Sequence, residues 1–238
     1  MAGSDTEKQT NEVKIAIPLL EAIDIAGKTI TADALLTQRD LATYLVGERK
    51  ADYHFTVKGN QKTLLEDITF YFDQTLRSPD YCHLSGSEHG RLETRSIWVS
   101  ATLNDYVNFP FVAQVFKIER HTIDKKSQKE SNEVIYGVTS RTSEQASAEA
   151  VLHNNRHHWC IENSCHYIID WNYDEDRSRI RTGYGPENMT RLRRFCVGLL
   201  KGRGVENIAQ KMRELMLNVR AVFDYLKMTK NTTKVSTT

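Results

Sequence analysis

The stretch EVKIAIPLLEAIDIAGKTITADA, residues 12–34, decides the fold of this chain. Its first half spaces apolar residues as one face of a helix does, at Ile15, Leu19, Leu20 and Ile23. This spacing predicts a helix over 12–24. Gly27 closes that helix, and residues 28–34 (KTITADA) read as a short buried strand. The opening pattern is therefore helix followed by strand.

The next residues repeat this pattern. A second helix is predicted over 38–49, and the alternating apolar residues Tyr53, Phe55 and Val57 predict a second strand that ends before Lys58. Alternating helices and strands of this length are typical of an α/β unit, in which consecutive strands pair in parallel. We therefore expect a parallel strand pair here.

The pattern changes further along the chain. After a helix near 61–76, three β segments between about 90 and 140 are joined by polar turns, which predicts an antiparallel insertion. Residues 143–171 return to helix, a further helix begins at Gly185-Pro186-Glu187, and a last one runs from Val205 to Lys227. Its apolar residues form a seven-residue repeat, at Ile208, Met212, Leu215, Val219, Val222 and Leu226.

Composition excludes several classes of protein. The 238 residues are 39% hydrophobic and 26% charged, as in globular proteins and unlike disordered chains. No stretch reaches the ~20 apolar residues of a membrane helix, and the polar start lacks a secretory signal, so we expect a cytoplasmic protein. The four cysteines show no CxxC spacing, which favours reduced thiols over a zinc site built with His157, His158 and His166.

The charge of the chain is unevenly distributed. From Arg177 to the end there are 14 Lys and Arg against 4 Asp and Glu, whereas the first 176 residues carry 18 against 27. A basic half beside an acidic half fits a surface that faces a polyanion and a centre that binds metal. A solvated basic tail would give the same asymmetry.

Asp33 is the first candidate for chemistry, because it stands at the carboxyl end of a predicted strand. Open α/β sheets bind ligands at that edge, although a single Asp there is also a common turn former. The second candidate is Glu162, which a helical projection places on the apolar half, between Trp159 and Ile169. A carboxylate facing the core needs a cation, so Glu162 either forms a buried ion pair with an arginine or binds metal.

Carboxylates from a strand end and a later helix are the ligands that Mg²⁺ prefers. Magnesium ions held in this way can activate water or a 3′-hydroxyl during phosphodiester cleavage. The acidic run Asp170, Asp174, Glu175 and Asp176 could add a ligand, but such a run is more often a solvated turn paired with arginines, here Arg177, Arg179 and Arg181.

Five segments resemble, in the same order, the H-repeat-associated transposases of bacterial insertion sequences, members of the DDE superfamily. They are residues 10–38, KGNQ at 58–61, HGRLETR at 89–95, RHHWCIENS at 156–164, and a run from Asp174-Glu175-Asp176 through SRIR at 178–181 to PENM at 186–189. The resemblance implies a ribonuclease H-like fold and places the family's second catalytic Asp on Asp33 and its catalytic Glu on Glu162. It also implies Mg²⁺, with Mn²⁺ as a substitute, and duplex DNA as the substrate.

The chain departs from the family in two ways. The family's first catalytic Asp lies on a strand ahead of the helix with which this chain begins, so the resemblance implies a core truncated at its amino end. The broader superfamily carries a Tyr-Arg-Glu-Lys signature around the Glu helix, and at those spacings this chain has Asn155, His158 and Ile169 instead of the Tyr, Arg and Lys.

Basic residues of these segments, together with two arginines on the polar side of the helix that begins at Gly185, are the candidates for DNA contact. They are expected to bind the DNA backbone by charge, not by base sequence. The set is Lys58, Arg156, His158, Arg177, Arg179, Arg191 and Arg194.

The sequence therefore predicts an α/β chain of ribonuclease H type. Residues 1–60 would form the partial core, 61–142 a helix plus the β insertion, and 143–238 the Glu helix and a basic helical end of the same domain. The expected function is DNA nicking and strand transfer in transposition, with the isolated chain inactive. A non-catalytic DNA-binding or regulatory remnant is the alternative, and a homo-oligomer or a full-length transposase is the expected protein partner.

Overall fold

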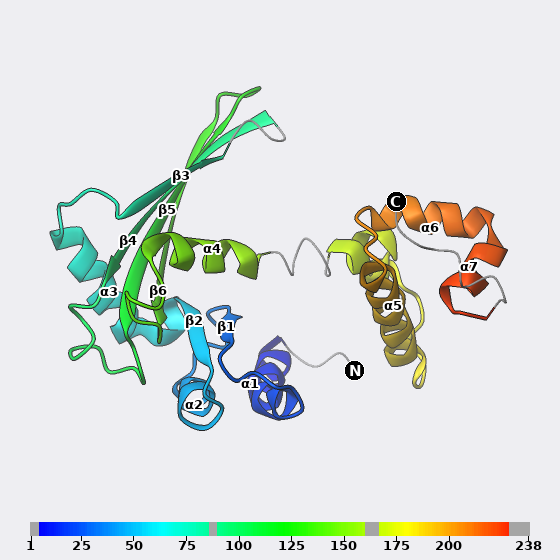
Figure 1. Cartoon of the computed structure of the whole chain (residues 1–238), viewed down its shortest axis with the longest axis horizontal. Coiled ribbons are helices and arrows are strands. Elements are labelled where there is room, and N and C mark those ends of the chain that lie inside the picture. Colours follow the sequence, from blue (N-terminus) through cyan, green and yellow to red (C-terminus); the bar gives the residue numbers. More distant parts are fainter. Residues whose placement is uncertain (1–4, 86–89, 160–166, 229–238) are drawn as a thin grey trace. The chain divides into compact units, whose positions relative to one another are not determined.

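The computed structural model describes residues 5–85, 90–159 and 167–228. The chain divides into two compact units, Met1–His158 and Trp159–Thr238, which we call the amino-terminal and the carboxy-terminal unit (Figure 1). Glu162 lies outside the described residues. The division of the chain into the parts 1–60, 61–142 and 143–238 remains a prediction.

The amino-terminal unit contains one mixed sheet and the helices that cover it. Its helices are α1 (Asp5–Glu21), α2 (Arg39–Thr43), α3 (Lys62–Gln74) and α4 (Ala148–His158), with a π-helical turn, Tyr44–Glu48, continuing α2 and a 3₁₀ turn, Gly59–Gln61, before α3. Its strands are β1 (Thr29–Ala32), β2 (Asp52–Val57), β3 (Tyr81–Ser85), β4 (Arg91–Ser100), β5 (Gln114–Asp124) and β6 (Glu130–Thr139).

The sheet has the order β1-β2-β6-β5-β4-β3. Strands β1 and β2 are parallel, with Ala32 opposite Phe55, and every other neighbouring pair is antiparallel. The predicted parallel pair and antiparallel β segments are thus confirmed, and the pairing of β6 with β2 makes them one sheet. Strand β3 was missed by the sequence pattern, because YCHLS has no consistent alternation of apolar and polar residues.

Both faces of the sheet are covered. On β2, Tyr53, Phe55 and Val57 point to one face, where they are buried in a core that also contains Leu64, Ile68 and Phe72 of α3. On the other face α4 packs its Val151 and Leu152 in a second core with Ile97, Phe116 and Ile118; Figure 1 shows α4 lying across the strands. Burying each large apolar side chain contributes roughly 1.5–3 kcal/mol.

Gly137 of β6 is required by the aromatic packing on the α4 face. A Cβ at this position would lie 2.1 Å from Cζ of Phe116 and 2.5 Å from the carbonyl oxygen of Phe55. The Phe116 ring instead passes over Gly137 and stacks on His54 of β2, with ring centroids 4.6 Å apart. A glycine in the middle strand therefore lets side chains of two non-adjacent strands meet.

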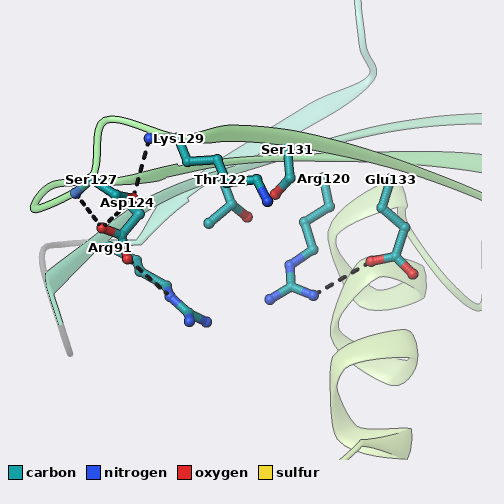
Figure 2. Close-up of a pocket in the computed structure, with 8 residues that line it drawn as sticks. All are labelled: Arg91, Arg120, Thr122, Asp124, Ser127, Lys129, Ser131 and Glu133. Atoms are coloured by element: carbon teal, nitrogen blue, oxygen red, sulfur yellow. Dashed lines mark hydrogen bonds and ion pairs between the residues drawn. The ribbon is translucent and has the colours of Figure 1, made fainter.

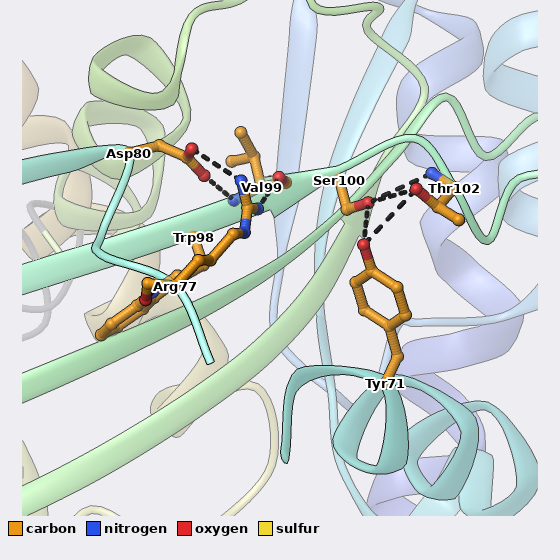
Figure 3. A network of polar contacts seen from close by, with 7 residues as sticks. All are labelled: Tyr71, Arg77, Asp80, Trp98, Val99, Ser100 and Thr102. Carbon is orange, nitrogen blue, oxygen red and sulfur yellow. Dashed lines mark hydrogen bonds and ion pairs between the residues drawn. The ribbon is translucent and has the colours of Figure 1, made fainter. Parts of the chain in front are cut away.

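Polar contacts fix the connection between α3 and β3 to the neighbouring strand β4 (Figure 3). Arg77 forms an ion pair of 2.9 Å with Asp80, whose second oxygen accepts a hydrogen bond from the backbone N–H of Val99 at 2.8 Å. The hydroxyl of Tyr71 lies 2.7 Å from that of Ser100. These bonds position the edge strand β3, which has little apolar surface to bury.

The carboxy-terminal unit is helical. It contains a π-helical turn, Ile168–Asn172, a 3₁₀ turn, Glu175–Arg177, and the helices α5 (Gly185–Gly202), α6 (Ile208–Leu217) and α7 (Val219–Tyr225). Its core residues are Ile168, Ile169, Val197, Leu200 and Ile208. The helix predicted to begin at Gly185 is confirmed, and no described helix of either unit is long and apolar enough to cross a membrane.

Two predictions about helices were wrong. The single helix predicted from Val205 to Lys227 breaks at Asn218, which has φ −139° and ψ 86° and whose side chain accepts a hydrogen bond from the N–H of Ala221. Asn caps a helix better than it continues one. The helix predicted over 143–171 is also shorter: α4 ends at His158, and Trp159, placed on its apolar half, is 53% exposed.

Candidate carboxylate site

Asp33 directly follows β1, and its side chain is exposed. One carboxylate oxygen, Oδ1, accepts a hydrogen bond of 3.3 Å from the backbone N–H of Leu36. Asp33 therefore does form a turn after β1, and the same hydrogen bond orients its carboxylate at the carboxyl end of the strand. Hard oxygen donors fixed in this way suit Mg²⁺.

Hydrogen bonds join the loop after β1 to the loop after β2. The buried hydroxyl of Thr37 donates to the carbonyl oxygen of Thr56 at 2.7 Å, and Nε2 of Gln61 donates to the carbonyl oxygen of Thr37 at 2.9 Å. Asn60 donates to the carbonyl oxygen of Ala34. The two segments KTITADALLTQ and KGNQ thus form one structural unit around Asp33.

The carboxyl end of α4 contacts the Asp33 strand. Nδ1 of His158, the last residue of α4, lies 3.2 Å from the hydroxyl of Thr31. Thr31 therefore points to the α4 side of the sheet, and Asp33 follows directly after the last residue of β1. Glu162 follows His158 by four residues in the sequence.

His54 lies beneath this contact. It is opposite Thr31 in the parallel pairing and 2% exposed, and neither ring nitrogen has a hydrogen-bond partner among the described residues. Burial, together with the nearby His158, lowers the pKa of His54 to about 3. The ring is therefore neutral near pH 7 and acts as an aromatic group stacked on Phe116.

Among the described residues no three His, Cys, Asp or Glu side chains gather closely enough to hold a metal ion. Asp33 is described, whereas Glu162 is not. Whether these two carboxylates share an ion stays a prediction.

Two predicted DNA-contacting residues of the amino-terminal unit lie at different places. Lys58 is exposed and follows β2, so it shares with Asp33 the edge formed by the carboxyl ends of the two parallel strands. Arg156 of α4 reaches away from β1, and its Nη1 lies 2.9 Å from Nε2 of His83 in β3. These two residues are therefore parts of separate surfaces.

The predicted arginines of the carboxy-terminal unit are all exposed. Arg177 lies 3.6 Å from Asp174, and Arg191 is paired with Glu187 at 2.5 Å. The exposed pair of Arg177 with Asp174 is what we expected from the sequence if the acidic run were a solvated turn. Arg179 and Arg194 are also on the surface, Arg194 on α5.

Glu175 of the acidic run has a structural partner. It accepts a hydrogen bond from Thr190 and lies 3.5 Å from Arg193, whose side chain is 11% exposed. This pair anchors the turn to α5. An exposed Arg177 and a buried Arg193 are indistinguishable by residue type, so sequence reasoning could not separate them.

His54 and Thr37, which are buried polar residues near Asp33, were also not identified from the sequence. His54 stands between Tyr53 and Phe55 in a strand expected to be buried, and a polar residue in such a strand is a usable signal. Thr37 gives no such signal, because Thr is common in turns.

Comparison with known proteins shows the family of the chain. Residues 4–197 match the family model described as the transposase DDE domain. This matched range contains both Asp33 and Glu162. The chain therefore belongs to the transposase DDE domain family.

Three relatives from Escherichia coli are similar over most of the chain. "Putative transposase YncI" of strain O157:H7 is 32% identical over 82% of this chain and 51% of its own length. From strain K12, "Putative protein YbfL" is 30% identical and "H repeat-associated putative transposase YhhI" 29% identical, each over 90% of this chain and 58% of its own length. The chain thus spans about half the length of these relatives.

Proposed function

We propose that this chain carries two of the three metal-binding carboxylates of a ribonuclease H-like transposase, namely Asp33 and Glu162. The observation that carries the proposal is the contact between His158 and Thr31. It joins the helix that precedes Glu162 in the sequence to the strand that Asp33 directly follows, two segments more than a hundred residues apart in the sequence. Membership of the DDE family supports divalent-metal chemistry.

The residues present fit Mg²⁺ in their chemistry. Asp33 offers an exposed carboxylate whose orientation is fixed by Leu36, and hard oxygen ligands are those that Mg²⁺ selects. When bound, the metal would activate the attacking oxygen and stabilise the leaving oxygen in phosphodiester cleavage. Asp33 and Glu162 would hold it, while the hydrogen bonds of Thr37 and Gln61 would keep the Asp33 loop in place.

The substrate in this proposal is duplex DNA, held through its backbone. Lys58 lies at the same sheet edge as Asp33, where it can neutralise a phosphate near the carboxylates. In the carboxy-terminal unit, Arg177, Arg179, Arg191 and Arg194 are exposed, as backbone contact requires. His158 contacts Thr31, so its role would be to support the site.

Metal binding tests the proposal directly. The electron paramagnetic resonance signal of free Mn²⁺, titrated with the chain, measures affinity without requiring catalysis. Asp33→Asn and Glu162→Gln should each weaken Mn²⁺ binding at least about tenfold, as expected when a charged ligand is lost. Asp105→Asn, which removes an exposed loop carboxylate, should leave the affinity unchanged. Equal affinities for all four proteins would contradict the proposal.

A further inference from the structure

The segment HGRLETR supplies one strand of a charged surface that the proposed carboxylate site does not use. Because every second side chain of a strand points to the same face, Arg91, Glu93 and Arg95 of β4 share one face of the sheet. Arg95 is opposite Arg120 of β5, and Arg120 is opposite Glu133 of β6. Two arginines therefore lie side by side on neighbouring strands, an arrangement that costs energy unless an anion compensates it.

Glu93 provides part of this compensation. Its Oε2 lies 2.6 Å from Nε of Arg120, and its Oε1 is paired with Arg95. The side chains of Glu93 and Arg95 are only 14% and 17% exposed, so both charges are largely removed from water. Glu133 lies farther from Arg120, at 3.4 Å, and its side chain is 52% exposed.

A third arginine approaches from α4. Nη1 of Arg156 lies 2.9 Å from Nε2 of His83, and because a guanidinium can only donate, this ring nitrogen must accept and carries no proton. Arg156 is therefore not neutralised by His83. Burial, the largest cause, and the positive charges of Arg156 and Arg120 lower the pKa of Arg95, although Glu93 raises it. His83 is opposite Arg95 in the pairing of β3 with β4, and Arg120 is opposite Arg95 in the pairing of β4 with β5. Arg95 therefore lies between Arg156 and Arg120 and is repelled by both.

We propose that Arg95, Arg120 and Arg156, the arginine cluster, bind a phosphate group of the DNA backbone. Guanidinium groups bind phosphate oxygens through paired, charge-assisted hydrogen bonds, and most strongly where they are partly removed from water. The identity of the ligand rests on the proposed function. An additional anion would relieve the repulsion among three cations that Glu93 and the exposed Glu133 only partly balance.

The surface next to the cluster suits a continuing backbone. An open groove of about 340 Å³ runs from Arg120 along the same face, and the described residues that line it are charged or carry hydroxyls. Its two carboxylates are each paired with an arginine, Asp124 with Arg91 and Glu133 with Arg120. Figure 2 shows Thr122 and Ser131 between Arg120 at one end and Lys129 and Arg91 at the other. Hydroxyls and cations of this kind are the usual partners of phosphate and sugar oxygens.

Binding of a short fluorescent duplex at several salt concentrations tests the proposal. Arg156→Gln should weaken binding about tenfold at low salt and reduce the slope of log affinity against log salt by about one. Arg156→Lys should keep the slope and lose only part of the affinity. Lys62→Gln, which removes an 81% exposed cation of α3, is the charge-matched control and should behave as the unmodified chain.

Glu93→Gln separates this site from a purely structural ion-pair network. Removing the carboxylate should tighten DNA binding several-fold, because the cluster then carries one more uncompensated positive charge. A structural network predicts instead that Glu93→Gln and Arg156→Gln both lower the melting temperature and leave DNA affinity and its salt slope unchanged. That result would overturn the proposal.

Inorganic phosphate distinguishes failure of this inference from failure of the proposed function. Phosphate should raise the melting temperature of the unmodified chain and of Lys62→Gln, but not that of the double variant Arg95→Gln, Arg156→Gln. If phosphate raises the melting temperature of the chain but the chain binds no DNA, the arginine cluster is an anion site for free phosphate. That result would contradict DNA as the substrate in the proposed function. Equal stabilisation of all three proteins would overturn the site itself.

Discussion

Nδ1 of His158 and the hydroxyl of Thr31 lie 3.2 Å apart, and this contact fixes the carboxyl end of α4 against β1, the strand that Asp33 directly follows. The contact joins the two segments from which the proposed metal ligands come. It depends on neither ligand, so it can be removed while both carboxylates remain.

Thr31→Val keeps the shape of the side chain and removes the hydroxyl. We expect the free energy of unfolding to fall by about 1 kcal/mol, the usual net contribution of one neutral hydrogen bond, and Mn²⁺ affinity to fall several-fold. Urea unfolding and Mn²⁺ titration measure the two effects. His153→Ala, on the exposed side of α4, should leave Mn²⁺ affinity intact; a similar loss in both variants would show that the contact has no special role.

Gly137→Ala should be among the most damaging single substitutions in the amino-terminal unit. The added Cβ would collide with both the Phe116 ring and the backbone of Phe55, and overpacking of this kind costs about 3 kcal/mol. Adding Phe116→Ala should rescue stability only in part, because the backbone collision remains. Gly198→Ala in α5, where a Cβ meets nothing within 4 Å, should instead stabilise by about 1 kcal/mol.

The buried His54 should make the chain less stable in acid. Its pKa is about 3 in the folded chain against 6.5 for the unperturbed group, so between these values the unfolded chain binds the additional proton. Stability therefore falls as pH is lowered through this window, by about 2 kcal/mol from pH 7 to pH 5.

His54→Phe, which preserves an aromatic ring on Phe116, should remove this part of the pH dependence. Unfolding by urea at pH 5 and pH 7 measures it. His121→Gln serves as the control, since His121 lies on the surface beside Glu130. An unchanged pH dependence in His54→Phe would mean that another group causes it.

The basic carboxy-terminal unit should bind duplex DNA in a salt-sensitive manner that tolerates changes of base sequence. Exchanging both Arg191 and Arg194 for Gln should weaken binding about tenfold or more and lower the salt slope. Arg193→Gln should mainly lower the melting temperature, because it leaves Glu175 partly buried without its cation. Fluorescence anisotropy at low and physiological salt, with thermal unfolding, separates the two effects; equal affinities would refute the assignment.

On the proposal that these 238 residues supply Asp33 and Glu162 as two of three metal ligands, they should not nick or join DNA by themselves, because two carboxylates hold two Mg²⁺ ions less well than three. Plasmid nicking with Mg²⁺ and with Mn²⁺ checks this. Metal-dependent nicking that disappears in both Asp33→Ala and Glu162→Ala would show the expectation to be wrong, and would point to a further carboxylate such as Asp174.

The local pattern of the sequence was sufficient to predict several helices and strands. The alternation of Tyr53, Phe55 and Val57 with polar residues predicted β2, because the side chains of these three residues are buried on one face of the strand. The dipeptide Gly185-Pro186 predicted the start of α5, since proline suits the first turn of a helix. Asp33 could be selected because strand ends in α/β sheets are recognisable from the chain itself.

Other features depended on residues that are distant in the sequence. The pairing of β6 with β2, the stacking of Phe116 on His54 over Gly137, and the contact of His158 with Thr31 are set by packing between segments. The same holds for the approach of Arg156 of α4 to Arg95, which is opposite Arg120 on the neighbouring strand. The sequence by itself determined which residues carry charge and which strand ends carry a carboxylate. Only the tertiary structure decided which of them meet, because contact energies depend on distance in space.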